Sequence, residues 1–298
     1  MMTTRTKIRF GVALGGGTVV GQLPGIVDQL EARGVDSLWF SELVYTPAVD
    51  PVVGMAHALG RTSRLKVGTS VAVLPGRHPV LVAKQLASLA ALAPKRVLPV
   101  FGLRPAAPGE RDLFAVPDGQ RAAVFDEALE LLRAVLDNDE VTFTGRFFSV
   151  HAASVGIHPA APVDIWLGGS APAAFRRIGR WGDGWLGSFL TPDEARRGRE
   201  SIERAATEAG REIEPDHFGL SLAVADDGLP DEAVAAVRKR RPDADPADLL
   251  AADWPQLHRQ LDGLIAAGLT KFVIRPLGAT PIDEFIDRFV DELLPRQN

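Results

Sequence analysis

The chain of 298 residues contains no cysteine. This absence excludes a disulfide framework, a thiol nucleophile and a metal site built from thiolates. The composition fits a reducing compartment, and we expect a cytoplasmic protein. No run of about 18 apolar residues occurs, so we expect no membrane-spanning helix. The basic start resembles a signal peptide, but its apolar run is short and is interrupted at Gly15–Gly17, so we expect no leader.

Motifs of several common enzyme classes are also absent. The chain has no P-loop, no G-x-S-x-G nucleophile elbow and no H-E-x-x-H metal motif. Gly15, Gly17 and Gly21 lack the G-x-G-x-x-G spacing of a dinucleotide site. The six histidines are scattered, and we expect no metal site. The formal net charge of −5 argues against a nucleic-acid-binding protein but permits a local basic pocket for an anionic ligand.

Short apolar segments alternate with segments of helical periodicity along the whole chain. We expect eight strands, at Arg9–Leu14, Ser37–Phe40, Leu65–Val73, Arg96–Gly102, Val163–Leu167, Gly184–Leu186, His217–Ala225 and Lys271–Pro276. We expect the main helices at Gln22–Ala32, Pro51–Leu59, Val80–Leu92, Gln120–Leu136, Ala173–Trp181, Thr191–Ala209, Trp254–Ala267 and Ile282–Leu293. The strands are continuous apolar runs, as is typical of a parallel sheet that is buried on both faces.

This alternation predicts a single (β/α)8 TIM barrel domain over residues 1–298. We expect insertions after the fourth strand, with a small hairpin at Val141–Val150, and after the seventh strand, at Leu229–Asp253. A doubly wound open sheet is the alternative architecture. In a barrel, the active site lies at the carboxyl ends of the strands.

The segment Asp164–Trp185 combines a strand, a glycine turn and a helix start. Two glycines before a helix allow close backbone approach, and the helix dipole favours an anion there. We expect Ser170 to be the N-cap, with Pro172 in the first turn. The segment fits a phosphate site and an ordinary strand-to-helix turn about equally well. At least two of the three following arginines (Arg176, Arg177 and Arg180) are expected to be solvated.

Residues that follow the expected strands are rich in glycine, hydroxyl groups and arginine, with one carboxylate, Glu42. This composition suits an anionic aromatic cofactor better than a metal ion, which needs several histidine or carboxylate ligands. Glu42 follows the second strand, where a carboxylate can act as a general acid or base. A solvated loop carboxylate is the simpler interpretation of the same residue.

Five segments together resemble the bacterial luciferase-like monooxygenase superfamily, and in particular its coenzyme F420-dependent oxidoreductases. They are GVDSLWFSE (residues 34–42), LKVGTSVAVLPGRHPVLVAKQLASL (65–89), RVLPVFGL (96–103), DIWLGGSAPAAFRRIGRWGDGW (164–185) and GLTKFVIRP (268–276). The resemblance implies a (β/α)8 barrel that binds a deazaflavin or flavin at the carboxyl ends of its strands.

The resemblance also assigns residues to the cofactor and the substrate. It implies a non-proline cis peptide at Ser70–Val71, or next to it, that supports the ring. It places the cofactor phosphate at Gly168, Gly169, Ser170 and Ala171, and other cofactor contacts at Ser41, Thr69, Ser70, Val71, Gly102 and Leu103. Arg104 and Arg275 fall on the substrate side.

One departure from the family pattern concerns the end of the second strand. Many deazaflavin dehydrogenases carry Asp-His there, whereas this chain has Ser41-Glu42. The missing imidazole argues against a sugar-phosphate dehydrogenase and leaves Glu42 as the expected catalytic acid/base or ring contact. The resemblance therefore predicts hydride transfer between F420 and a small organic substrate, by a homodimer. The alternatives are an FMN-dependent monooxygenase that works with a separate flavin reductase, a barrel that binds its ligand without turnover, and a phosphosugar-handling barrel.

Overall fold

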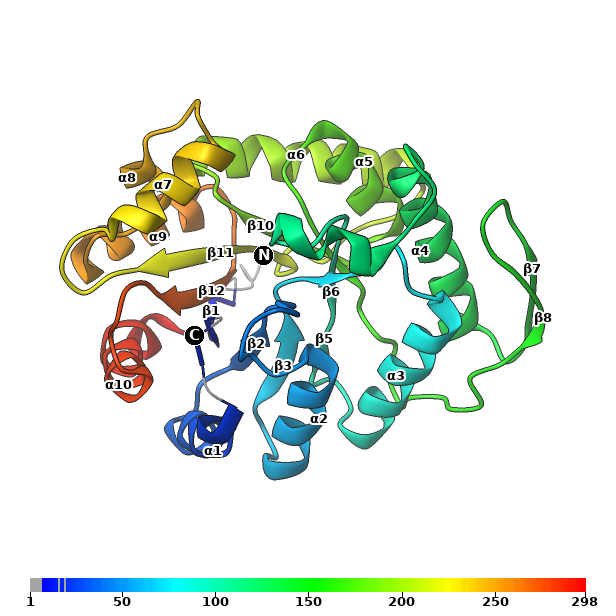
Figure 1. Cartoon of the computed structure of the whole chain (residues 1–298), viewed down its shortest axis with the longest axis horizontal. Helices are drawn as coiled ribbons and strands as arrows, with labels where there is room; N and C mark the ends of the chain where they lie inside the picture. The colour runs from blue at the N-terminus through cyan, green and yellow to red at the C-terminus, as the bar shows by residue number, and fades with distance from the viewer. Residues whose placement is uncertain (1–6, 16, 19) are drawn as a thin grey trace, which may run out of the picture.

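The fold is given by a computed structural model that describes residues 7–15, 17–18 and 20–298 (Figure 1). Gly16, which belongs to the first glycine turn, lies outside the described residues. The central sheet contains β1 (Arg9–Ala13), β2 (Ser37–Phe40), β3 (Lys66–Thr69), β4 (Ala72–Val73), β5 (Val97–Leu98), β6 (Val100–Gly102), β9 (Trp166–Gly168), β10 (Gly184–Ser188), β11 (Phe218–Val224) and β12 (Lys271–Pro276).

The helices surround this sheet in Figure 1. They are α1 (Leu23–Arg33), α2 (Pro51–Arg61), α3 (Pro79–Leu92), α4 (Arg121–Asp137), α5 (Pro172–Trp181), α6 (Pro192–Glu208), α7 (Asp231–Arg240), α8 (Pro246–Leu249), α9 (Trp254–Ala266) and α10 (Ile282–Leu293). Short 3-10 helices are η1 (Val20–Gln22), η2 (Pro108–Phe114) and η3 (Leu294–Arg296). Within the described part of the chain, no helix combines the length and the apolar character needed to cross a membrane.

All pairings in the central sheet are parallel, in the order β4-β6-β9-β10-β11-β12-β1-β2-β3-β5. The two ends of this order belong to neighbouring segments, because β4 directly follows β3 and β6 directly follows β5. Since β3 pairs with β5 and β4 pairs with β6, the sheet curls round upon itself. The chain thus has a mixed α/β fold with a curled parallel sheet.

Two of the expected strands are interrupted. The expected strand Leu65–Val73 is divided into β3 and β4 at Ser70–Val71, and Arg96–Gly102 is divided into β5 and β6 at Pro99. Proline has no N–H to donate, so Pro99 cannot continue the hydrogen-bond ladder. Its carbonyl still accepts from Trp166 N at 2.9 Å, which joins this segment to β9.

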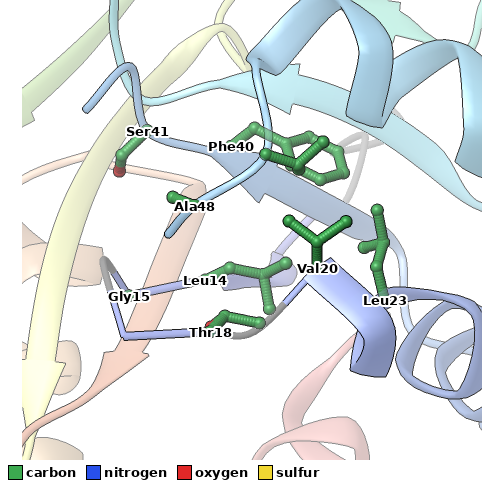
Figure 2. A pocket seen from close by; sticks show the side chains of 9 residues that line it. Leu14, Gly15, Thr18, Val20, Leu23, Phe40, Ser41 and Ala48 are labelled. Carbon is green, nitrogen blue, oxygen red and sulfur yellow. The ribbon is translucent and has the colours of Figure 1, made fainter. Parts of the chain in front are cut away.

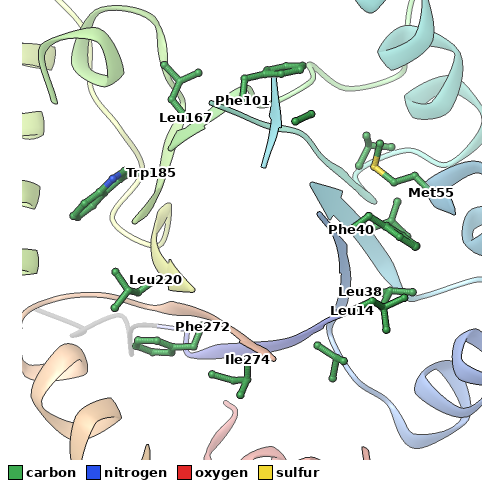
Figure 3. Packing of buried hydrophobic residues seen from close by; sticks show 14 of the residues in the cluster. Leu14, Leu38, Phe40, Met55, Phe101, Leu167, Trp185, Leu220, Phe272 and Ile274 are labelled. Atoms are coloured by element: carbon green, nitrogen blue, oxygen red, sulfur yellow. The ribbon is translucent and has the colours of Figure 1, made fainter. Parts of the chain in front are cut away.

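Side chains alternate between two hydrophobic layers along the strands. Phe10, Leu38 and Phe272 face the helices, and Figure 3 shows the last two with other members of this outer layer. A smaller inner layer, enclosed by the sheet, consists of Ala13, Trp39, Val100, Trp166, Leu186 and Val273. Because successive residues of a strand point to opposite faces, the inner layer fixes which later residues face the enclosed space.

A buried ion cluster joins β2, β3 and β12 near their amino-terminal ends. The carboxylate of Asp36, directly before β2, accepts from Lys271 Nζ at 2.8 Å and from Lys66 Nζ at 3.0 Å. Burial disfavours ionisation of Asp36, but the charges and hydrogen bonds of the two lysines outweigh it and lower the pKa of Asp36 to about 2. The cluster lies at the opposite end of the strands from the expected site.

Two segments leave the central sheet. The hairpin consists of β7 (Val141–Thr144) and β8 (Ser149–Ala153), which pair antiparallel and project from the body beside α4 in Figure 1. The excursion at 229–253 forms α7 and α8. A capping box begins α6, because Thr191 and Glu194 exchange side-chain and backbone hydrogen bonds.

Candidate active site

Ser41 and Ser70 meet where β2 and β3 end. The Ser41 hydroxyl donates to the Ser70 carbonyl at 3.2 Å, and the two hydroxyl oxygens are 3.4 Å apart. The peptide bond between Ser70 and Val71 is cis, which confirms the prediction made from the resemblance. Both serines are partly exposed, so their hydroxyl groups face a space that a ligand can reach.

The side chain of Val71 lies against two glycines from neighbouring strands. A Cβ added to Gly102 would lie 2.6 Å from Val71 Cγ2, and one added to Gly168 would lie 3.2 Å from Val71 Cγ1. Only glycine lets β6 approach Val71 this closely, because any larger residue would have to displace it. The structure therefore brings together Val71, Gly102 and Gly168, which sequence reasoning placed in three separate motifs.

A layer of mostly small residues lies beyond the inner hydrophobic layer. Each member follows an inner-layer residue by two positions: Gly15, Ser41, Gly102, Gly168, Ser188 and Arg275. The two-residue period of a strand places these residues over the same enclosed space. We call them the mouth layer. Glycine and serine contribute little side-chain volume above the two tryptophans of the inner layer. A Cβ added to Gly15 would meet no atom within 4 Å, whereas Val71 fills the space beside Gly102 and Gly168.

Arg275 is the charged residue of the mouth layer. It is half-buried, and among the described residues it forms no hydrogen bond or salt bridge. Burial lowers its pKa from the ordinary arginine value, because a charged guanidinium loses hydration there. An arginine stays protonated nonetheless, so Arg275 presents a cation without a carboxylate partner to the mouth.

Glu42 is enclosed by its own protein rather than solvated. Its side chain is buried, and it accepts from Val73 N at 2.7 Å and from Arg77 Nη1 at 2.9 Å. Arg77 in turn lies over the ring of Phe114, with Cζ 5.0 Å from the ring centroid. The carboxylate thus ties the end of β2 to β4. Sequence reasoning interpreted the segment containing Arg77 only as a turn and missed this partner.

The glycine turn after β9 has a constrained backbone. Gly169 has φ +120°, and a Cβ added there would lie 2.8 Å from the Cβ of Ala174. The Gly169 carbonyl accepts from Trp185 Nε1 at 2.8 Å, which fixes the turn to β10. Trp185 was not among the predicted site residues, because its apolar ring alone indicates core packing.

The prediction that Ser170 is the N-cap of α5 is wrong. The helix begins at Pro172, its N-cap is Ala171, and no side chain caps it. Ser170 is exposed and therefore belongs to the turn. Pro172 has no N–H, and Ala174 N donates to the Ala171 carbonyl at 2.8 Å, so the Ala173 amide is the first-turn donor that faces an external acceptor. An anion is the acceptor that the helix dipole favours there.

The remaining predicted residues lie around the same opening. The buried Thr69 hydroxyl donates to Val100 O at 2.7 Å and accepts from Val100 N at 2.8 Å, so it bridges two strands. Leu103 is partly buried against the core, whereas Arg104 is exposed. Arg176 and Arg180 are exposed, as predicted for at least two of the three arginines, and Arg177 forms a salt bridge with Asp126.

Two further features border the opening. An apolar recess lies between the segments after β1 and β2; Figure 2 shows Leu14, Thr18, Phe40 and Ser41 among its walls. On another side, Tyr45 N donates to Glu110 Oε1 at 2.9 Å, which attaches η2 to the loop after β2. Across the described ranges, no group of three or more histidines, aspartates or glutamates could hold a metal ion.

Comparison with known proteins relates this geometry to a family. The sequence model of the luciferase-like monooxygenase family matches residues 2–263. An uncharacterized protein of Mycobacterium tuberculosis (strain ATCC 25618 / H37Rv) is 39% identical over 158 residues, or 53% of this chain and 54% of that protein. That match therefore spans about half the length of the relative.

Two further comparisons extend over most of the chain. An F420-dependent glucose-6-phosphate dehydrogenase of Beutenbergia cavernae is 29% identical over 306 residues, covering 89% of this chain and 90% of that protein. The structure of an F420-dependent secondary alcohol dehydrogenase with an F420–acetone adduct has a TM-score of 0.81 at 20% identity, covering 98% of this chain and 100% of that chain. At that identity the structural match shows a shared fold. Because the family model matches most of the sequence, the chain belongs to the luciferase-like monooxygenase family, as its motifs predict.

Proposed function

We propose that the protein is a coenzyme F420-dependent oxidoreductase that transfers a hydride between the deazaflavin ring and a small organic substrate. The carrying observation is the mouth layer, in which glycine and serine contribute little side-chain volume and Arg275 supplies one cation. The names of the dehydrogenases described above support the same cofactor. In this proposal the curled sheet is a closed (β/α)8 TIM barrel in one domain over residues 1–298, with insertions after the fourth and seventh strands.

The residues present fit such a cofactor. Val71 with Ser70 forms a surface for one face of the ring, and Ser41, Gly102 and Leu103 lie beside it. Gly168–Ala171 and the uncapped start of α5 suit the phosphate, because a Cβ at Gly169 would fill the close approach that the backbone offers. Thr69 acts behind this surface, through the backbone of Val100. When bound, the deazaflavin supplies hydride chemistry with little reactivity toward oxygen.

Arg275 and Arg104 are assigned to the substrate side. A guanidinium in a partly buried mouth stabilises negative charge that develops on a substrate oxygen or nitrogen when hydride is added. Arg275 suits this role because no carboxylate of the described residues neutralises it. The apolar recess beside Ser41 suits the apolar part of the same substrate.

Glu42 is assigned to the ring side of the site. Its hydrogen bonds with Val73 and Arg77 hold in place the segment that carries Val71. Glu42 therefore positions the surface on which the ring lies. The Asp-His pair of many deazaflavin dehydrogenases is replaced here by Ser41-Glu42. We therefore infer a substrate other than a sugar phosphate.

The second candidate function is an FMN-dependent monooxygenase that takes reduced flavin from a separate reductase. The name of the matched family favours it, and FMN offers the same phosphate and a similar fused ring. For either function we infer a cytoplasmic homodimer. Helix α3 exposes Leu81 and Leu92, which are 67% and 83% accessible, and these side chains support packing of α3 against a second copy.

The test is a pair of fluorescence titrations of the purified protein, one with oxidised F420 and one with FMN. We expect tight binding of F420, whereas tight binding of FMN without binding of F420 would reverse the assignment. Reduced F420 is then mixed with electron-poor alkenes, imines and ketones. Consumption of the reduced cofactor with any of them distinguishes an enzyme from a barrel that only binds its ligand.

A further inference from the structure

A surface hollow of about 570 Å³ lies along helices α5 and α6, outside the sheet. It begins at Ser170, in the turn proposed to hold the cofactor phosphate. Arg176 of α5 and Arg197 and Arg204 of α6 line it, above a floor that includes Phe175 and Gly198. We call it the arginine groove. Figure 1 shows the two helices side by side, so the groove leads from the phosphate turn along the outer surface.

Three of the four arginines that line the groove, Arg176, Arg197 and Arg204, have no carboxylate partner among the described residues, whereas the fourth, Arg241, is paired. Arg204 Nη2 donates only to the Ser201 hydroxyl, at 3.0 Å, and Arg176 and Arg197 form no salt bridge. Neighbouring arginines on α6 are paired: Arg196 with Asp193 at 2.8 Å and Arg199 with Glu203 at 2.8 Å. The groove therefore presents cations that the protein itself leaves available.

The acidic residues of the groove are placed so that they leave this positive charge in excess near Ser170. Glu194 and Asp243 are both bound by Arg241, at 2.7 Å and 3.0 Å. Glu208 lies at the far end of α6, about 16 Å along the helix axis from Arg197 at 1.5 Å per residue. The end of the groove next to the phosphate turn is thus the more basic end.

We propose that the arginine groove binds the polycarboxylate tail of the cofactor. This inference rests on the proposed function, because coenzyme F420 extends beyond its phosphate through a lactate into a chain of γ-linked glutamates. Arg197 and Arg204 are about 10 Å apart along the helix, so an extended anionic chain can meet them one after the other. A chain of acidic residues that starts at Ser170 can pass Arg176 and Arg197 before it reaches Arg204. FMN ends at its phosphate and leaves the arginine groove empty.

The effect of the groove on affinity is predicted to be moderate and sensitive to salt. Exposed ion pairs are weak, so each arginine contributes roughly a twofold to fivefold gain in affinity for a tailed cofactor. The attraction is screened within about 10 Å at 0.1 M salt and more strongly at higher salt. Several such contacts together give a tail effect of about tenfold at low salt.

The experiment compares two forms of oxidised cofactor by fluorescence titration: one that ends at the phospholactate and one with several glutamates. For the wild-type protein at low salt, we expect the tailed form to bind about tenfold more tightly. This ratio should fall toward one at high salt. In Arg197→Gln with Arg204→Gln the ratio should be close to one at every salt concentration.

The matched control is Arg196→Gln, which removes the same charge from the neighbouring residue, whose guanidinium is held by Asp193. It should keep most of the wild-type ratio, while Arg197→Gln alone loses a large part of it. Equal affinities of wild type for both forms would overturn the groove proposal and leave the cofactor proposal intact. An equal loss in Arg196→Gln and Arg197→Gln would also overturn it, because the effect would then be long-range charge. Binding of neither form would instead overturn the proposed function.

Discussion

Gly169 satisfies two backbone requirements at a single position. Its φ of +120° is a conformation that residues with a Cβ rarely adopt, and a Cβ would also press on Ala174. The Trp185 hydrogen bond holds the carbonyl of the same residue. The turn is therefore fixed from both sides, so any change at this residue must move the amides that face the proposed phosphate.

A Gly169→Val substitution should weaken F420 binding at least tenfold and lower the free energy of unfolding by roughly 1–3 kcal/mol. Fluorescence titration and urea unfolding measure the two effects. Gly60→Ala in α2 is the control, because a Cβ there meets no atom within 4 Å. That control should change stability by less than about 1 kcal/mol and leave affinity unchanged. Unchanged affinity in a folded Gly169→Val protein would refute the phosphate assignment.

Arg275 shows the opposite relation between a residue and its surroundings. A half-buried cation without a partner lowers folding stability, because its lost hydration is not replaced. Arg275→Met should therefore raise the unfolding free energy by roughly 1 kcal/mol while it lowers kcat/KM by at least tenfold. Thermal melts test the predicted gain in stability, and turnover of reduced F420 tests the predicted loss of kcat/KM. Arg64→Gln, on an exposed side chain, should change neither; a destabilised Arg275→Met protein would mean that Arg275 has a structural role.

Individual residues were predicted unequally well from the sequence. The cis bond at Ser70–Val71 was anticipated because a resemblance carries such a local feature residue by residue. The burial of Glu42 was not anticipated from the sequence. Its partner Arg77 follows 35 positions later, and only the folded chain brings the two together. Whether Glu42 contacts substrate or cofactor stays a prediction.

At the scale of elements, the pair of Glu42 and Arg77 connects β2 to β4 and to the turn before α3. The salt bridge is half-shielded, since the side chain of Glu42 is 4% exposed and that of Arg77 is 33% exposed. Removing one partner leaves the other charge poorly solvated. This salt bridge, which we call the Glu42–Arg77 brace, should therefore hold the whole segment that carries Val71 in place.

Glu42→Gln should lower the unfolding free energy by roughly 1–3 kcal/mol, and Arg77→Gln should have a similar effect. Both should reduce kcat in parallel, with no change in the shape of the pH–rate profile. Stopped-flow oxidation of reduced F420 across pH provides the profile. If Glu42→Gln alone abolishes one limb of the profile, Glu42 transfers a proton and the assignment as a brace is wrong.

Element boundaries also show where local rules suffice. The start of α6 was predicted correctly because Thr191 and Glu194 form a capping box within four residues. The N-cap of α5 was placed one residue too early, because serine is the better cap in isolation but Ser170 precedes the observed N-cap, Ala171. The division between β5 and β6 is likewise local, since Pro99 breaks the hydrogen-bond ladder. The sequence-based strand for Arg96–Gly102 did not account for it.

For the whole molecule, alternation of apolar strands and helices predicted a parallel sheet, and that prediction is confirmed. The curling of the sheet was not readable from any single segment. It depends on the pairing of β3 with β5 and of β4 with β6, which are contacts between residues 30 and 29 positions apart. The register that stacks the mouth layer has the same origin, because it requires all strands to be aligned at once.

The ion cluster at the amino-terminal ends of the strands makes the stability of the whole sheet depend on pH. Asp36 has a pKa of about 2 in the folded protein, below its ordinary value of 3.8. Its stabilising contribution is therefore complete above about pH 4 and is lost as the pH falls through 2. The difference between the two pKa values corresponds to roughly 2 kcal/mol of stability at neutral pH.

Asp36→Asn should lower the unfolding free energy at pH 7 by roughly 3–5 kcal/mol, because it leaves Lys271, which is 6% exposed, without its carboxylate. Urea unfolding between pH 7 and pH 3 measures this loss. The gap between wild type and Asp36→Asn should narrow as the pH falls below 4, since protonation removes the same charge from the wild type. Adding Lys271→Met to Asp36→Asn should restore much of the stability, because no buried cation is then left unpaired. The control Asp28→Asn removes an exposed partner of Arg61 and should produce little change at any pH. A gap that stays constant down to pH 3 would show that Asp36 acts through packing rather than through its charge.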